Sequence, residues 1–141
     1  METLMNRSDV KELRKPNNMV VLPVSSDDDF FRLWCTCLKP FINLTNREME
    51  VVACMLKVRH ELSRSISDLA ILDSVVFSED SRRRIMQECK LSAQHFSVIL
   101  SSLKKSGVLK GNSIDQKVVP NITQDSNGVF QFLILLKRDN Q

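Results

Sequence analysis

Apolar residues recur every three or four positions through most of the first 106 residues, which is the spacing of amphipathic helices. The first helix should begin at Ser25–Asp29, because serine or aspartate caps a helix and acidic side chains suit its positive end. It should end before Pro40 and place Trp34, the single tryptophan, in the core. A capping box at Thr45–Glu48 opens a second helix that reaches residue 62 or 63. Two apolar stripes on this second helix predict contacts on both of its sides.

Three shorter helices are predicted after it. Ser67–Asp68 can cap an apolar segment that ends at Val76, and the segment Ser78–Ser81 opens a helix over residues 82–90. Ser92 caps a longer helix over residues 93–106, which is followed by a glycine suited to the left-handed position after a helix. One apolar stripe predicts the buried face of this longer helix: Phe96, Ile99, Leu100 and Leu103.

The pattern changes to that of β-structure after Gly107. Val108–Leu109 begins a short strand, residues 117–122 are expected to be extended, and residues 129–136 form a strongly β-prone strand. Turn-forming residues at 123–128, which end in Asn-Gly, connect the last two segments into a hairpin. The sequence therefore predicts a mainly α fold with a C-terminal β-hairpin.

The order of helix, tight turn, helix, glycine and hairpin is that of a winged helix-turn-helix. We assign the helix-turn-helix to residues 78–106 and the wing to residues 108–137. Both belong to a winged-helix domain at residues 27–141 that has an extra N-terminal helix. Residues 1–26 form an N-terminal arm or extended segment, and a chain of 141 residues favours a single domain.

Composition argues against several classes of protein. No apolar run approaches 18 residues and the polar N-terminus lacks a signal-peptide core, so we expect a cytoplasmic protein without a membrane partner. The four cysteines form no C-x-x-C pair and only two histidines are present, so no metal site is predicted. The cysteines are expected to be small buried hydrophobes in a reducing compartment. No phosphate loop or catalytic constellation is recognisable, so neither enzymatic activity nor a cofactor is expected.

The net charge of +3 is unevenly distributed along the chain. Residues 78–110 contain seven basic and three acidic side chains, a net charge of +4. Residues 1–40 and 111–141 are each neutral, and residues 41–77 carry a charge of −1. A local excess of positive charge is typical of proteins that bind an anionic partner, and here it coincides with the predicted helix-turn-helix.

Residues 81–110, SRRRIMQECKLSAQHFSVILSSLKKSGVLK, resemble the winged-helix DNA-binding domains of MarR-like regulators. The shared pattern is S-x-x-x-F-x-x-x-L-x-x-L-K-K-x-G-V-L, in which the recognition helix runs into the first strand. Residues 44–52, LTNREMEVV, resemble the opening of the first helix in MarR-like and LuxR-type regulators, although the later helices do not continue the LuxR spacing. Residues 75–92, VVFSEDSRRRIMQECKLS, are similar to small winged-helix proteins of tailed phages and mobile elements of gut bacteria. The resemblance spans residues 44–137 and implies a DNA-binding protein of a bacterial cytoplasm or a phage-infected host.

The face of the helix over residues 93–106 that lies opposite its buried stripe is predicted to contact DNA. Its polar side chains can bond base edges, glutamine preferring adenine, and its exposed valine can touch a thymine methyl group. Two lysines near its end can reach phosphates. Three consecutive arginines begin the preceding helix, which usually crosses the DNA backbone, and two of them are expected to face solvent. The candidate residues are Arg82, Arg83, Arg84, Gln94, Ser97, Val98, Ser101, Lys104 and Lys105.

Two functions fit these features. The first is a DNA-binding transcription regulator or replication accessory that binds double-stranded DNA, expected as a homodimer. The second is a structural or adaptor protein that uses the same fold for contacts with a partner protein in a viral or polymerase-associated assembly. The predicted wing turn, Thr123–Gly128, favours the second function because it carries Asp125 and no basic residue. An exposed Val98 would suit a protein contact as well as a thymine methyl group.

Overall fold

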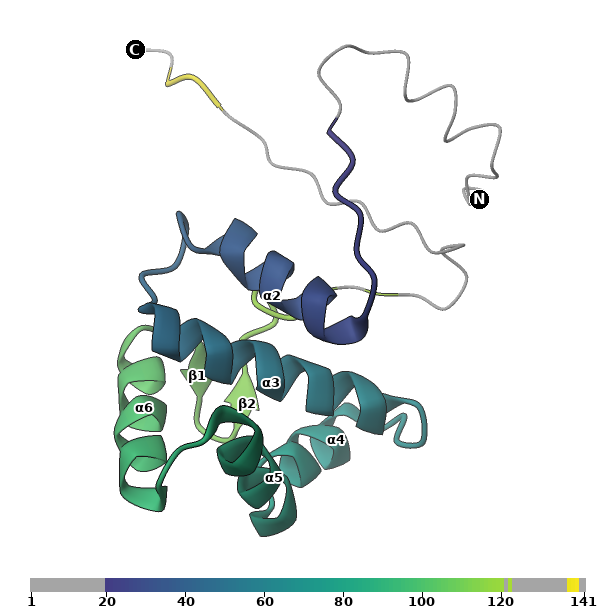
Figure 1. The fold of residues 1–141 in the computed structure, drawn as a ribbon, viewed down its shortest axis with the longest axis vertical. Coiled ribbons are helices and arrows are strands. Elements are labelled where there is room, and N and C mark those ends of the chain that lie inside the picture. The colour runs from purple at the N-terminus through teal and green to yellow at the C-terminus, as the bar shows by residue number, and fades with distance from the viewer. Residues whose placement is uncertain (1–19, 121, 123–136, 140–141) are drawn as a thin grey trace. The chain divides into compact units, whose positions relative to one another are not determined.

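The computed structural model describes residues 20–120, 122 and 137–139. Each helix in this part of the chain is preceded by a polar residue whose side chain accepts a backbone hydrogen bond from the first turn. The helices are α2 (Asp27–Leu38), α3 (Asn46–Ser63), α4 (Leu69–Val76), α5 (Glu79–Cys89) and α6 (Ala93–Lys105) (Figure 1). Their caps are Ser26, Thr45, Asp68, Ser78 and Ser92. The five predicted helices are confirmed, with α5 beginning three residues earlier than expected, at Glu79, because Ser78 caps it directly.

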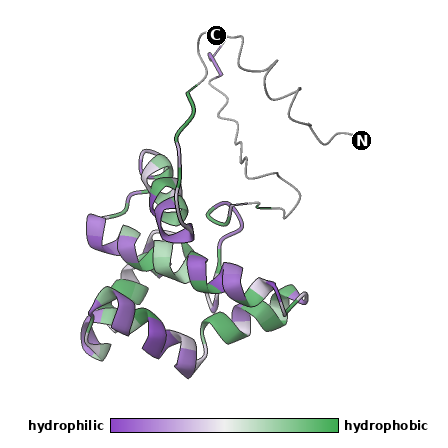
Figure 2. Ribbon diagram, turned by 45° about the vertical axis from the view of Figure 1, so that its right-hand side comes forward, coloured by the Kyte–Doolittle hydropathy of each residue, from purple (hydrophilic) through white to green (hydrophobic). Residues whose placement is uncertain are grey.

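The helix α3 is the centre of the compact unit formed by Pro23–Pro120. It packs against α2, α4 and α5, and Figure 1 shows α2 on one side of it and α4 and α5 on the other. The predicted two-sided burial is confirmed, and in Figure 2 the helices carry both hydrophobic and hydrophilic residues, as amphipathic helices do. The buried apolar residues of α3 are Val51, Val52, Ala53, Met55, Leu56 and Val58.

The helix α2 joins this core through one large aromatic side chain. Trp34 is 9% exposed, and its indole Nε1 donates a hydrogen bond to the carbonyl of Val118 at 2.7 Å. This bond ties a segment 84 residues later in the chain to α2. The prediction that Trp34 is a core residue is therefore confirmed, and its polar edge has a partner, as buried tryptophan requires.

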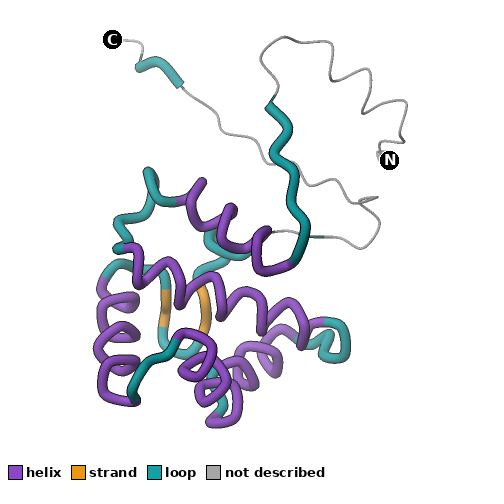
Figure 3. Tube along the Cα trace, viewed as in Figure 1, coloured by secondary structure: helices purple, strands orange, loops and turns teal. Residues whose placement is uncertain are grey.

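A small antiparallel hairpin follows α6, formed by β1 (Leu109–Lys110) and β2 (Ser113–Ile114) (Figure 3). Its two-residue turn is Gly111-Asn112, and Gly111 has a φ of +64°, which fits the glycine position of a type II′ turn. The prediction of a mainly α fold with a β-hairpin is therefore confirmed. The hairpin lies earlier in the chain than predicted, because Gly-Asn is itself a turn signal that directly joins two strands.

The expectation of an extended segment at residues 117–122 is wrong where the structure describes it. Val118 donates a backbone hydrogen bond to the carbonyl of Asp115 at 2.9 Å, which makes a turn at residues 116–118. The turn predicted at residues 123–128 and the strand predicted at residues 129–136 lie outside the described residues.

Replacement of a buried leucine on α6 tests the packing of this helix. We expect Leu103→Ala, at a side chain with 0% exposure, to lower the free energy of unfolding by about 2–5 kcal/mol, because it removes buried methyl groups and leaves a cavity. Urea denaturation measures the difference. The matched control is Val98→Ala on the opposite face of the same helix, expected to change stability by less than about 0.5 kcal/mol. Equal losses in the two variants would contradict the assigned faces of α6.

Candidate nucleic-acid interface

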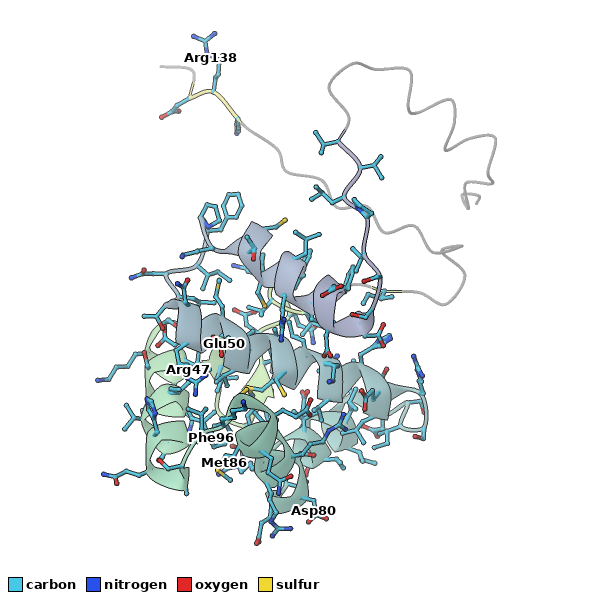
Figure 4. All side chains as sticks on the ribbon, in the orientation of Figure 1. Arg47, Glu50, Asp80, Met86, Phe96 and Arg138 are labelled. Atoms are coloured by element: carbon cyan, nitrogen blue, oxygen red, sulfur yellow. The ribbon has the colours of Figure 1, made fainter. Side chains whose placement is uncertain are left out.

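The exposed face of α6 is the surface on which six of the nine candidate residues meet. The buried stripe is the predicted one, with Phe96, Ile99, Leu100 and Leu103 packed into the core, and Figure 4 shows Phe96 on the side of α6 that faces α5. The opposite face is open, and Val98 near its middle is 61% exposed. All six candidates of this helix are exposed: Gln94, Ser97, Val98, Ser101, Lys104 and Lys105.

The charge on this face has one sign. The helix contains no aspartate or glutamate, and Lys104 and Lys105 form no ion pair with any residue in the described part of the chain. The exposed Lys90, in the turn before α6, likewise has no ion-pair partner among those residues. The N-terminal end of α6, next to Gln94, adds the positive end of the helix dipole. The charged side chains at both ends of α6, Lys90 before it and Lys104 and Lys105 in its last turn, are therefore positive.

The turn between α5 and α6 is held by a residue that the sequence analysis did not identify. Arg47 of α3 donates from Nη2 to the carbonyl oxygen of Cys89 at 2.7 Å, and its Nη1 bonds Glu50 at 2.7 Å (Figure 4). The next residue, Lys90, has a φ of +56°, the left-handed conformation that strains a non-glycine residue. Because the guanidinium donates hydrogen bonds to the carbonyls of Cys89 and Lys90, it supports the strained turn that sets the direction of α6.

A buried carboxylate fixes the other half of α6 to α3. Glu48 is 8% exposed; it accepts from the backbone of Thr45 at 2.8 Å and from the hydroxyl of Ser102. Burial alone would raise the pKa of Glu48, but the hydrogen bonds from Ser102 and Thr45 outweigh it, and the pKa is lowered. The sequence predicted the capping box at Thr45–Glu48, which is confirmed, but gave no indication that the second carboxylate oxygen binds α6.

The three candidate arginines on α5 each have an internal partner. Arg82 is half-buried and donates from Nε to the carbonyl of Phe77, at the end of α4, at 3.0 Å. The side chain of Arg83 is 57% exposed, but it pairs with Glu79 and Asp80 in the first turn of its own helix. The side chain of Arg84 is 42% exposed and bonds both Glu61 and Glu88. Two of the three therefore reach solvent, as expected, but each has its charge compensated.

Arg84 belongs to an ion-pair network that joins three helices. Lys57 of α3 lies 2.8 Å from Asp28 of α2 and 2.8 Å from Glu88 of α5. Arg84 connects Glu88 to Glu61 of α3 at 2.8 Å. The hydrogen bonds to Asp28 and Glu88 raise the pKa of Lys57, so the ammonium stays charged although it is largely covered. These arginine and lysine side chains stabilise the helix packing. Within residues 78–110, the positive side chains with neither an ion-pair partner nor a hydrogen bond among the described residues are Lys90, Lys104 and Lys105.

Neither a metal cluster nor a membrane span is formed by the described residues. No three metal-ligating side chains come together within that part of the chain, and none of its helices has the length and hydrophobicity to cross a bilayer. No family model, no curated protein and no solved structure matches the chain.

The contact between Glu48 and Ser102 predicts a pH dependence of stability. A carboxyl whose native pKa is lowered stabilises the folded state above its ordinary pKa of 4.5, and that contribution is lost as the pH falls through the lowered native value. At pH 7, Glu48→Gln should therefore lower the free energy of unfolding by about 1–3 kcal/mol, and the difference from wild type should shrink toward pH 3.

Denaturant unfolding at a series of pH values measures this difference. Glu50→Gln is the matched control, because the Glu50 side chain is 55% exposed on the same helix, and it should change stability by less than about 0.5 kcal/mol. A Glu48→Gln penalty that is constant between pH 7 and pH 3 would refute the role assigned to the ionised carboxylate.

Proposed function

We propose that this chain binds double-stranded DNA through the exposed face of α6, as a winged helix-turn-helix protein. The observation that carries the proposal is the composition of that face. It presents small and polar side chains followed by two lysines with no ion-pair partner among the described residues, and the helix has no acidic residue. A helix held out from the core by a tight turn can enter the major groove, which is about 12 Å wide.

Within this proposal the residues of α6 divide by role. Gln94 can form the two hydrogen bonds that glutamine makes with adenine, and Val98 can contact a thymine methyl group. The hydroxyls of Ser97 and Ser101 can bond any base edge. Lys104 and Lys105 bind phosphates and supply affinity without sequence preference. Arg83 is the arginine most available for a further phosphate contact, because its partners are two acidic side chains that are themselves 88% and 94% exposed.

The observed hairpin supports DNA binding better than the predicted wing does. Its turn at Gly111-Asn112 is preceded by Lys110, whose side chain is 69% exposed, with Asp115 at 3.6 Å. A basic residue beside a short turn is suited to a phosphate next to the groove that α6 would occupy. The proposal therefore uses the hairpin of β1 and β2 as the wing, in place of the acidic turn predicted at Thr123–Gly128.

The proposal includes a cellular role and an oligomeric state for the chain. A transcription regulator or replication accessory in a bacterial cytoplasm or a phage-infected host agrees with the resemblance to MarR-like and phage winged-helix proteins. A homodimer is proposed because two copies would place two recognition helices in successive major grooves, about 34 Å apart.

A second candidate function is favoured by exposed apolar side chains. Val98 on α6 is 61% exposed, and Leu69 and Ile71 on α4 are 57% and 54% exposed. Apolar side chains exposed in this way suit the contacts of an adaptor or structural protein in a viral or polymerase-associated assembly. Binding of that kind would depend on these apolar residues and change little with salt, whereas phosphate contacts weaken steeply as salt rises.

Removal of the two lysines tests the first proposal. In a fluorescence anisotropy titration with a labelled duplex, Lys104→Ala/Lys105→Ala should lower affinity about tenfold or more at low salt. The slope of log affinity against log salt should become shallower by about 2, because two phosphate contacts are lost. The loss should be similar for duplexes of different sequence.

The control variant is Arg32→Ala/Lys117→Ala, which removes two exposed positive charges outside α6, from α2 and the segment held by Trp34. It changes the net charge by the same amount and should leave most of the affinity in place. Absent DNA binding at low salt, or equal losses in both variants, would reject α6 as the DNA-binding element.

Sequence preference is tested at the first turn of α6. Once a preferred duplex has been selected from a random library, Gln94→Ala should reduce discrimination at one A·T base pair by about 1–3 kcal/mol while preserving binding to random DNA. Competition titrations with single-base-pair variants measure this discrimination. His95→Ala, at an exposed neighbouring position outside the candidate set, is the control. Unchanged discrimination in Gln94→Ala would remove Gln94 from the proposed base contacts.

A further inference from the structure

Two of the four cysteines meet between α3 and α5. Cys54 lies in the middle of α3 and Cys89 is the last residue of α5. The thiol of Cys89 donates to the carbonyl oxygen of Glu50 at 3.8 Å, and Glu50 lies one helical turn before Cys54 on α3. Both cysteines line one cavity of about 110 Å³, together with Asp28, Arg32, Glu50, Ala53 and Glu88.

The surroundings of the pair distinguish the two sulfur atoms. Interaction with the neighbouring Cys54 thiol lowers the pKa of Cys89, and the charge of Arg47 acts in the same direction. Interaction with the Cys89 thiol, together with burial, raises the pKa of Cys54. Cys35 is a contrast, because burial without such a neighbour raises the pKa of its thiol to about 12. Cys89 is therefore the sulfur of this pair that more readily becomes a thiolate, the nucleophilic form of cysteine.

The position of Cys89 connects the pair to α6. Its carbonyl oxygen accepts the 2.7 Å hydrogen bond from Arg47, and Lys90 beside it has the strained left-handed φ of +56°. Leu91 then bonds back to the carbonyl of Met86 at 2.9 Å, and Ser92 caps α6. Only three residues separate Cys89 from Ala93, the first residue of the proposed recognition helix α6. A displacement of Cys89 therefore changes the geometry of the turn between α5 and α6.

We propose that Cys54 and Cys89 form a redox modification site, which a peroxide converts into a reversible disulfide between α3 and α5. The Cys89 thiolate attacks one oxygen of hydrogen peroxide, the O–O bond breaks, and hydroxide leaves and takes a proton to become water. Cys54, after losing its proton, then attacks the sulfur of the resulting sulfenic acid, and the oxygen leaves as a second water. The two thiols lose two electrons in total, and these electrons reduce one peroxide to two waters.

Formation of this bond changes the geometry at the end of α5. Two sulfurs that are not bonded stay at least a van der Waals contact apart, whereas a disulfide holds them at about 2.05 Å and requires a dihedral angle near 90°. Cys89 must therefore move toward α3, which disturbs the Arg47 contact and the strained Lys90 turn. The consequence for DNA rests on the proposed function: the oxidised chain presents α6 in a different orientation and binds DNA more weakly.

The experiment treats the full-length reduced chain with hydrogen peroxide and maps its disulfides by mass spectrometry. The expected product has lost two hydrogens, contains linked peptides with Cys54 and Cys89, and returns to the starting mass with dithiothreitol. In Cys54→Ser, Cys89 should stop at the sulfenic acid, which dimedone traps, whereas Cys37→Ser should form the disulfide like wild type. Absence of the link in wild type, or a link through Cys35 or Cys37, would overturn the site.

DNA binding of the reduced and oxidised wild type completes the test. We expect oxidation to lower affinity about tenfold, and the same treatment to leave Cys54→Ser much less affected. A disulfide that forms without changing affinity would overturn the coupling to α6. If the reduced chain does not bind DNA but the disulfide forms, the proposed function fails and the redox site stands. If the reduced chain binds DNA and no disulfide forms, the redox site fails and the proposed function stands.

Discussion

Burial of α3 on both of its sides is the constraint on which the rest of the described structure depends. A helix whose apolar residues point in two directions cannot be covered by a single neighbour, so α2 must pack on one side and α4 and α5 on the other. The polar residues of α3 that remain are then placed at the boundaries between its neighbours. Arg47 reaches the end of α5, Glu48 reaches α6, and Lys57 reaches both α2 and α5. One helix therefore supplies both the core and the contacts that orient the candidate surface.

The basic character of residues 78–110 divides into two physically different parts. The arginines of α5 lie among acidic side chains and carbonyl oxygens, where a planar guanidinium with several donors can connect elements of the fold. The lysines around α6 have few such neighbours: Lys90, Lys104 and Lys105 have no ion-pair partner among the described residues. Net charge along the sequence counts both groups equally, but only charge without an internal partner attracts an external anion strongly. The candidate surface is therefore smaller than the sequence suggested and centred on α6.

The helices were predictable because their signals are local. A capping residue, an apolar stripe and a terminating residue all lie within one segment, as at Ser92, along the face that includes Leu103, and at Gly107 with its φ of +85°. The strands of the hairpin are only two residues each, which is too short for an alternating pattern of polar and apolar residues. The prediction therefore placed the hairpin at the longer β-prone segments later in the chain and missed the turn at Gly111-Asn112. The contact of Ser102 with Glu48 could not be predicted, because it joins residues 54 positions apart and depends on how α6 meets α3.

The sequence by itself determined where the helices lie, to within three residues at their ends, and which face of α6 is buried, since hydrogen-bonded caps and helical periodicity act over a few residues. It also placed the excess positive charge between residues 78 and 110. Only the tertiary structure decided which of those charges are free, because Arg82 bonds a carbonyl just after α4 and Arg84 bonds Glu61 of α3. The same holds for the pairing of Cys54 with Cys89, 35 positions apart along the chain. Distances between side chains of separate elements are set by packing, and no local pattern in the chain encodes them.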